Sequence, residues 1–155
     1  MMLPKSEQAV AMFVAGYSCA QSLLATYGPD LGLDRETALK AAAPLAGGVS
    51  RTDGPCGATS GALLVLGLKY GHTRPDDAEG EERIRILTQE YLRRYAARKG
   101  CTSCTGLLGV NLGEPGVAER VKVEGLTQEV CPELVRASCE ILEELLDHPD
   151  QEFPA

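Results

Sequence analysis

Apolar residues recur at helical spacing along most of the chain. Near the N-terminus, Val10, Phe13, Tyr17 and Leu24 are separated by three, four and seven residues. This spacing places them on one face of a helix, and the Gly-Pro pair at 28–29 would end that helix. We therefore expect one continuous amphipathic helix that begins at about Ser6 and ends before the Gly-Pro pair.

The same reasoning predicts further helices along the chain. They cover about residues 34–48, with Pro44 inside, then 56–71, 79–99 and 131–147, with a short helical turn within 101–110. Residues 117–123 fit either a helical turn or a short strand, and the pattern does not separate the two. We expect an all-α, single-domain bundle of about five helices over residues 1–148, followed by a flexible polar tail over 149–155.

The segment "CGATSGALLVLGLKYG" (56–71) differs from the other helices because apolar or small residues surround it almost completely. Lys69 is its first charged residue after Cys56. A helix that is apolar on all sides is buried, and one of this length is a central core helix rather than a membrane span. Gly57 and Gly61 each lower helix propensity by about 1 kcal/mol relative to Ala. We therefore expect another backbone or a cofactor to approach closely beside Cys56.

Composition and charge exclude several classes of function. The 155 residues are 44% hydrophobic, with 2 Phe and no Trp, so the core should be aliphatic. The formal charge is -7 and the chain has no basic run, which argues against nucleic-acid and anionic-lipid partners. The N-terminus lacks the apolar region of a signal peptide, and no run of about 18 or more apolar residues occurs. We expect a cytoplasmic protein without membrane insertion.

The six cysteines are the candidate chemical groups. In a reducing compartment, cysteines serve more often as catalytic thiols or metal ligands than as permanent disulfides. Cys56 would open the central helix, and Cys131, followed by Pro132, would open the last helix. Cys101 and Cys104 would precede the short turn. Because a helix N-terminus favours negative charge, these positions predict thiolates with lowered pKa values.

The other two cysteines lie inside predicted helices. Cys19 lies away from the apolar stripe of the first helix, on a face of small residues that suits a close-packed neighbour or the lining of a cleft. This face, together with the apolar central helix, is also compatible with a homodimer. Cys139 lies toward the edge of the apolar stripe of the last helix. We expect Cys139 to pack as a small hydrophobic residue.

Common catalytic and metal-binding motifs are absent from the sequence. Cys101 and Cys104 form a C-x-x-C pair, but Thr105 rather than His follows, so the c-type haem attachment pattern is missing. A zinc ribbon needs a second such pair. We find no P-loop, dinucleotide-binding glycine pattern or Ser/His/Asp order. His72 and His148 are expected to be exposed rather than ligands.

Four stretches of the sequence each contain one cysteine in a distinctive setting. They are "SCAQSLLATYG" around Cys19, "CGATSGALLVLGLKYG" at Cys56, "CTGLLG" at Cys104 and "CPELVRASCEILEELL" at Cys131. Together they resemble the C_GCAxxG_C_C family of redox-active proteins, over about residues 19–146. The resemblance implies that these four cysteines are the characteristic ones.

The resemblance also assigns the remaining motif residues. Gly57 and Gly61 would be the glycines of its central motif, and residues 1–148 would form one domain of this type. Cys101 and Cys139 would be additional cysteines outside the family pattern.

Three hypotheses for function follow. In the first, the four characteristic cysteines converge at one end of the bundle and cycle between thiols and disulfides, or pass electrons to a redox partner protein. Such a chain would act as a thiol-dependent oxidoreductase. In the second, the same four thiolates hold an iron–sulfur cluster or a zinc ion, with Cys101 as a further ligand. In the third, the chain is a helical interaction protein with incidental cysteines. The pairing of the cysteines and the substrate stay open.

Overall fold

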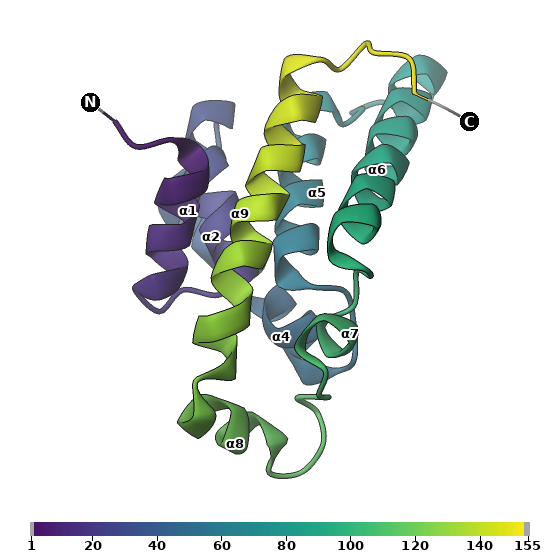
Figure 1. Ribbon diagram of the computed structural model, residues 1–155. Coiled ribbons are helices and arrows are strands. Elements are labelled where there is room, and N and C mark those ends of the chain that lie inside the picture. Colours follow the sequence, from purple (N-terminus) through teal and green to yellow (C-terminus); the bar gives the residue numbers. More distant parts are fainter. Residues whose placement is uncertain (1, 154–155) are drawn as a thin grey trace.

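Helices make up nearly all of the regular structure in the computed structural model, which describes residues 2–153 (Figure 1). They are α1 (Lys5–Val14), α2 (Cys19–Tyr27), α3 (Arg35–Ala42), α4 (Ala46–Arg51), α5 (Gly57–Tyr70), α6 (Ala78–Lys99), α7 (Cys104–Leu108), α8 (Val117–Glu124) and α9 (Leu126–Asp147), with 3-10 turns at Pro29–Leu31 and Ala43–Leu45. Within the described residues there is no strand beyond one isolated bridge. The all-α prediction is confirmed, and the ambiguous segment 117–123 is helical.

The central helix of the bundle is α5. It packs against α2, α6 and α9, and Figure 1 shows it running behind α9 and between α2 and α6. Its residues Ala58, Ala62 and Val65 are fully buried. The expectation that this helix is buried all round is wrong in detail, because Leu64 and Leu68 are each 39% exposed. One apolar edge of α5 therefore faces outward.

The expected single N-terminal helix is two helices. The helix breaks after Val14, where Gly16 adopts a left-handed backbone with φ 113°. Ser18 then caps α2: its hydroxyl accepts a hydrogen bond from the Gln21 backbone, while the Gln21 side chain accepts one from the Ser18 backbone. This reciprocal capping box satisfies two orphan N–H groups of the new helix. As a result, Cys19 is the first residue of α2 and not a mid-helix residue.

Glycines allow α2 to approach α5 closely. A Cβ at Gly61 would lie 2.8 Å from the Cβ of Leu23 and 3.0 Å from the carbonyl oxygen of Ala20. A Cβ at Gly57 would lie 3.1 Å from the backbone nitrogen of Ala20. The group that approaches α5 at both positions is therefore the backbone of α2. This close contact brings the first residue of α2 beside the first turn of α5.

The last helix begins earlier than its sequence suggests. It starts at Leu126, after Gly125 adopts a left-handed conformation, and Pro132 lies inside it. Proline is usual in the first turn of a helix because the N–H groups of that turn make no hydrogen bond within the helix, so none is lost. Here Pro132 lies beyond the first turn, so the prediction that Cys131 opens the helix is wrong. Cys131 is instead an interior residue of α9.

The C-terminal segment folds back toward α6 (Figure 1). Arg83 on α6 pairs with Asp150 at 2.9 Å, and the guanidinium of Arg94 lies over the ring of Phe153. The predicted flexible tail also includes residues 154–155, which lie outside the described residues. Among the helices of residues 2–153, none has both the length and the apolar character needed to span a membrane.

Candidate functional site

Four cysteine side chains border one cavity of about 380 Å³. They are Cys19 at the start of α2, Cys56 just before α5, Cys104 at the start of α7 and Cys131 within α9. The cavity lies at the end of the bundle where α4 and α7 are found in Figure 1. All four are free thiols. The fold thus collects on one cavity four cysteines that are widely separated in sequence.

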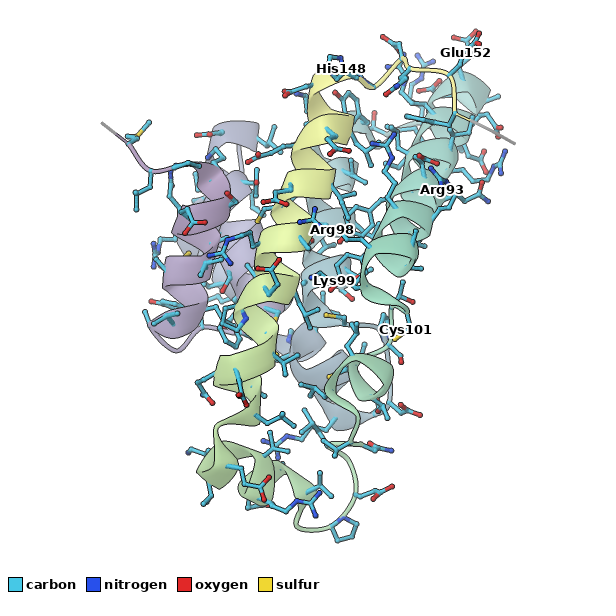
Figure 2. The ribbon with its side chains drawn as sticks, in the orientation of Figure 1. Arg93, Arg98, Lys99, Cys101, His148 and Glu152 are labelled. Carbon is cyan, nitrogen blue, oxygen red and sulfur yellow. The ribbon has the colours of Figure 1, made fainter. Side chains whose placement is uncertain are left out.

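The other two cysteines do not border this cavity. Cys101 lies at the outer edge of the loop that follows α6, as Figure 2 shows, and its sulfur is 4.0 Å from the carbonyl oxygen of Ser103. Cys139 is fully buried in the core, in agreement with the expectation that it packs as a small hydrophobic residue. Burial raises the pKa of Cys139 to about 12.

Backbone pairing fixes two of the cavity cysteines relative to each other. The backbone N–H of Cys56 donates to the carbonyl oxygen of Thr102 at 2.7 Å, and that of Cys104 donates to the carbonyl oxygen of Gly54 at 3.1 Å. These two hydrogen bonds flank the isolated antiparallel bridge between the loops that precede α5 and α7. The loops therefore hold Cys56 and Cys104 together before either helix begins.

A left-handed turn forms part of the cavity wall. Within α4, five consecutive residues have positive φ angles: Gly47 (66°), Gly48 (72°), Val49 (56°), Ser50 (53°) and Arg51 (65°). For residues other than glycine, this conformation costs about 1–2 kcal/mol each. The sequence predicted a helix end and a loop here. The turn that forms instead places Gly47 and Arg51 at the cavity.

Gly48 in this turn packs directly against a cavity cysteine. A Cβ at Gly48 would lie 2.7 Å from the Cβ of Cys104 and 2.9 Å from the carbonyl oxygen of Gly54. Both the left-handed backbone and the lack of space therefore require glycine at this position. The left-handed turn thereby determines where Cys104 lies.

At Cys56, burial raises the pKa of the thiol more than the helix N-terminus lowers it. Its side chain caps no backbone group of α5, and only 4% of the residue is exposed. Desolvation raises the pKa of the Cys56 thiol more than Tyr95 and the backbone N–H groups of Ala58 and Thr59 lower it. The predicted lowered pKa is therefore wrong for Cys56. The free-energy cost of a charged thiolate in this apolar site exceeds the stabilisation that the helix N-terminus gives.

The Cys19–Cys131 pair behaves differently. The neighbouring Cys19 thiol lowers the pKa of Cys131, whereas the Cys131 thiol and burial raise the pKa of Cys19. The expected direction for Cys131 is confirmed, but its cause is the thiol of Cys19 and not a helix N-terminus. By contrast, burial raises the pKa of Cys104 to about 12. Cys131 is therefore the thiol of this cavity that ionises most readily.

Sequence reasoning missed Tyr95, which lies beside Cys56. The Tyr95 hydroxyl is 3.6 Å from the Cys56 sulfur, and its ring stacks on that of Tyr91 with centroids 5.9 Å apart. The Tyr91 hydroxyl is in turn 2.7 Å from that of Ser138, which donates to the Ala58 carbonyl oxygen at 2.8 Å. Two tyrosines four residues apart lie on one face of a helix. This spacing within the highly charged α6 was the sequence signal that could have indicated a buried tyrosine pair.

The rest of the cavity wall is mainly apolar with a polar border. Phe13, Leu107, Leu108, Leu112 and Leu134 supply the apolar wall, while Tyr17, Ser18, Thr127 and Gln128 supply polar groups. Of the described residues at the cavity, Arg51 is the one charged side chain. A concave, mainly apolar cavity of this size suits a small-molecule ligand.

A metal centre was the second hypothesis for these thiols. Across residues 2–153, no three or more Cys, His, Asp or Glu side chains are grouped so that they could hold one metal ion. A thiolate zinc or iron–sulfur site requires ligands that converge on a common point. The hypothesis that the four cysteines hold a zinc ion or an iron–sulfur cluster stays a prediction.

Comparison with known proteins gives a family match. The family model described as "Putative redox-active protein (C_GCAxxG_C_C)" matches residues 17–145. The matched region includes all four cysteines that border the cavity. No curated protein and no solved structure matches the chain.

Proposed function

The chain belongs to the C_GCAxxG_C_C family, and from that premise we propose that the cavity is a dithiol–disulfide redox site. In this site Cys131 is the attacking thiolate and Cys19 is its partner. Cys56 and Cys104 form a second pair of thiols on the same cavity. The function is thus the transfer of two electrons between protein thiols and a disulfide substrate.

The observation that carries the proposal is the gathering of four free thiols, Cys19 and Cys131 among them, on one cavity. Thiol–disulfide exchange needs a thiolate as the nucleophile, so the rate near neutral pH depends on how readily the attacking cysteine ionises. Among these thiols, Cys131 has a lowered pKa because the neighbouring Cys19 thiol stabilises its thiolate. Cys19 is also in place to attack Cys131 in the next step.

The reaction takes place in two exchanges. The Cys131 thiolate attacks one sulfur of the substrate disulfide, the substrate S–S bond breaks, and the first substrate thiolate leaves and is protonated. Cys19 then loses its proton and attacks the Cys131 sulfur of the mixed disulfide, which releases the second substrate thiol. The products are a Cys19–Cys131 disulfide and two substrate thiols, and two electrons have moved from the protein to the substrate.

The second thiol pair extends this scheme. Cys56 and Cys104 border the same cavity and are held side by side by the hydrogen bonds of their preceding loops. Their raised pKa values keep them protonated near neutral pH, so they are poor first attackers. We assign them the role of passing electrons to an oxidised Cys19–Cys131 pair by internal exchange.

A thiol count tests the function. Fully reduced protein, with six free thiols, is treated with the neutral probe 2-hydroxyethyl disulfide, and the remaining thiols are counted after the small molecules are removed. We expect two thiols to be lost first in the native chain and in the matched control Cys101→Ser. Cys19→Ser should stop at a mixed disulfide on Cys131, and Cys131→Ser should react slowly. Six free thiols after long exposure would contradict the proposal.

A further inference from the structure

One cation at the cavity has no ionic partner. Within residues 2–153, Arg51 takes part in none of the salt bridges, whereas Arg83, Arg93, Arg94 and Arg136 are all paired. Its side chain borders the cavity together with the four thiols. Arg51 is exposed, so its guanidinium is free to bind an anion that enters this cavity.

The backbone of Arg51 adopts an uncommon conformation. Arg51 is the last residue of the left-handed turn, with φ 65°, a conformation that residues with side chains rarely adopt. A Cβ at Gly47 would lie 3.4 Å from the Cγ of Arg51, and a Cβ at Gly113 would overlap its carbonyl oxygen. The first distance is an ordinary van der Waals contact, whereas the second shows that glycine at 113 leaves room for the backbone of Arg51. This left-handed position makes Arg51 one of the residues that line the cavity.

The chemistry of the cavity indicates what the guanidinium would bind. A guanidinium offers a planar fork of donors that matches a carboxylate. The volume of about 380 Å³ and the apolar wall suit a small organic molecule. Building on the function proposed above, we propose that the substrate is a small disulfide that carries a carboxylate. Arg51 binds the carboxylate while the substrate sulfur meets Cys131.

The reaction transfers two electrons from the protein thiols to the substrate disulfide. The carboxylate-bearing disulfide accepts two electrons and becomes two carboxylate-bearing thiols, while Cys19 and Cys131 become a disulfide. The two protons released by these cysteines end on the two product thiols. Arg51 takes no part in the electron transfer and acts as the residue that determines specificity.

Three probes of similar size and different charge test this specificity. They are 3,3′-dithiodipropionate, which is anionic, cystamine, which is cationic, and the neutral 2-hydroxyethyl disulfide. The second-order rate of thiol loss from the reduced protein is measured with each. The net negative charge of the chain would favour the cation, so a preference for the anion must come from a local group. We expect the anionic probe to react about fivefold faster than cystamine, the effect of one partly exposed ion pair.

Charge reversal at two arginines supplies the matched comparison. Arg120 is exposed, forms no salt bridge within residues 2–153 and does not border the cavity. Arg51→Glu should invert the anion-to-cation rate ratio, and Arg51→Lys should keep part of it. Arg120→Glu makes the same change in net charge and should leave the ratio nearly unchanged.

The outcomes separate this inference from the proposed function. If native protein reacts with cystamine as fast as with dithiodipropionate, or if both charge reversals change the ratio equally, Arg51 is not the specificity residue. In that case oxidation by the neutral probe still supports the dithiol site. If the neutral probe also leaves all thiols free, the dithiol function fails and the substrate assignment fails with it.

Discussion

The sulfur of Cys56 lies 3.6 Å from the hydroxyl oxygen of Tyr95, and both side chains are buried. The hydroxyl is the side-chain group that counteracts the effect of burial on this thiol most strongly. Tyr95 is itself held by stacking on Tyr91, whose hydroxyl contacts Ser138. The cysteine cavity is therefore supported from the core by an aromatic pair on α6.

Tyr95→Phe should raise the pKa of Cys56 further, because the thiolate loses its hydrogen-bond donor. A hydrogen bond to a charged group contributes about 1.5–3 kcal/mol, so an increase of about 1 in the pKa is expected. Alkylation of Cys56 at pH 8, followed by mass spectrometry, should then be about tenfold slower. Tyr91→Phe is the matched control, since it removes a buried hydroxyl from the same helix without removing the contact with Cys56. Equal slowing in both variants would contradict the role of Tyr95.

Removal of the Cys19 thiol should raise the pKa of Cys131. The pKa of Cys131 lies below the ordinary value of 9.0 because the neighbouring Cys19 thiol stabilises its thiolate. Cys19→Ala removes this thiol, whereas Cys19→Ser keeps a hydroxyl that can donate. The alkylation rate of Cys131 followed against pH should show its midpoint moving upward in Cys19→Ala and less in Cys19→Ser. A midpoint that is the same in native protein and Cys19→Ala would refute this role of Cys19.

Two glycines of α5 should respond in opposite ways to the same substitution. Gly61→Ala places a Cβ 2.8 Å from Leu23, so α2 and α5 must separate, and we expect a loss of about 1–3 kcal/mol in unfolding free energy. A Cβ at Gly67 would meet nothing within 4 Å. Gly67→Ala should therefore stabilise the chain by about 0.5–1 kcal/mol through helix propensity. Urea unfolding of both variants checks the signs, and a stable Gly61→Ala would show that α2 does not pack this closely.

Glu90 should stabilise the fold in a pH-dependent way. Its side chain is 4% exposed and pairs with Arg93 and Arg94, each at 2.7 Å, which lowers its pKa below the ordinary 4.5. A lowered carboxyl pKa gives stability that is complete above about 4.5 and is lost as the pH falls through the folded-state value. Glu90→Gln should cost about 1–2 kcal/mol at pH 7, where Arg93 is partly screened by solvent, and the difference from native should shrink in acid.

The control for this experiment is an exposed carboxylate on the same helix. Glu82 pairs with Arg85 at the surface, so Glu82→Gln should leave the unfolding free energy almost unchanged. Urea unfolding at pH 7 and at acidic pH compares the two variants with native protein. A Glu90→Gln deficit that stays constant with pH would mean that packing, not charge, is responsible.

The sequence carries most of the information about the long helices. The expected central helix, 56–71, is found at Gly57–Tyr70 with Cys56 just before it, and the expected 79–99 helix is Ala78–Lys99. Glycine and proline at their ends and continuous apolar or charged periodicity within them are local signals. The break before Cys19 was also present locally, as the Ser18–Gln21 capping box, but the apolar stripe ran through it and suggested one helix.

The cavity itself depends on information that is not local. The left-handed turn from Gly47 to Arg51 includes Val, Ser and Arg residues, whose own preferences oppose it, so only its surroundings can stabilise it. Likewise, the meeting of Cys19 with Cys131 follows from how α2 and α9 pack, and the raised pKa of Cys56 follows from burial by several helices. Residue pattern identified the four cysteines, whereas their different acidities required the tertiary structure.

The central claim is that Cys19 and Cys131 form the disulfide of the first oxidation step. Reduced protein is oxidised with a limiting amount of 2-hydroxyethyl disulfide, remaining thiols are alkylated, and the protein is digested and mapped by tandem mass spectrometry. We expect a peptide pair joined through Cys19 and Cys131, with Cys101 and Cys139 alkylated. A first disulfide that joins any other pair of cysteines, or no disulfide among the cavity cysteines, would contradict it.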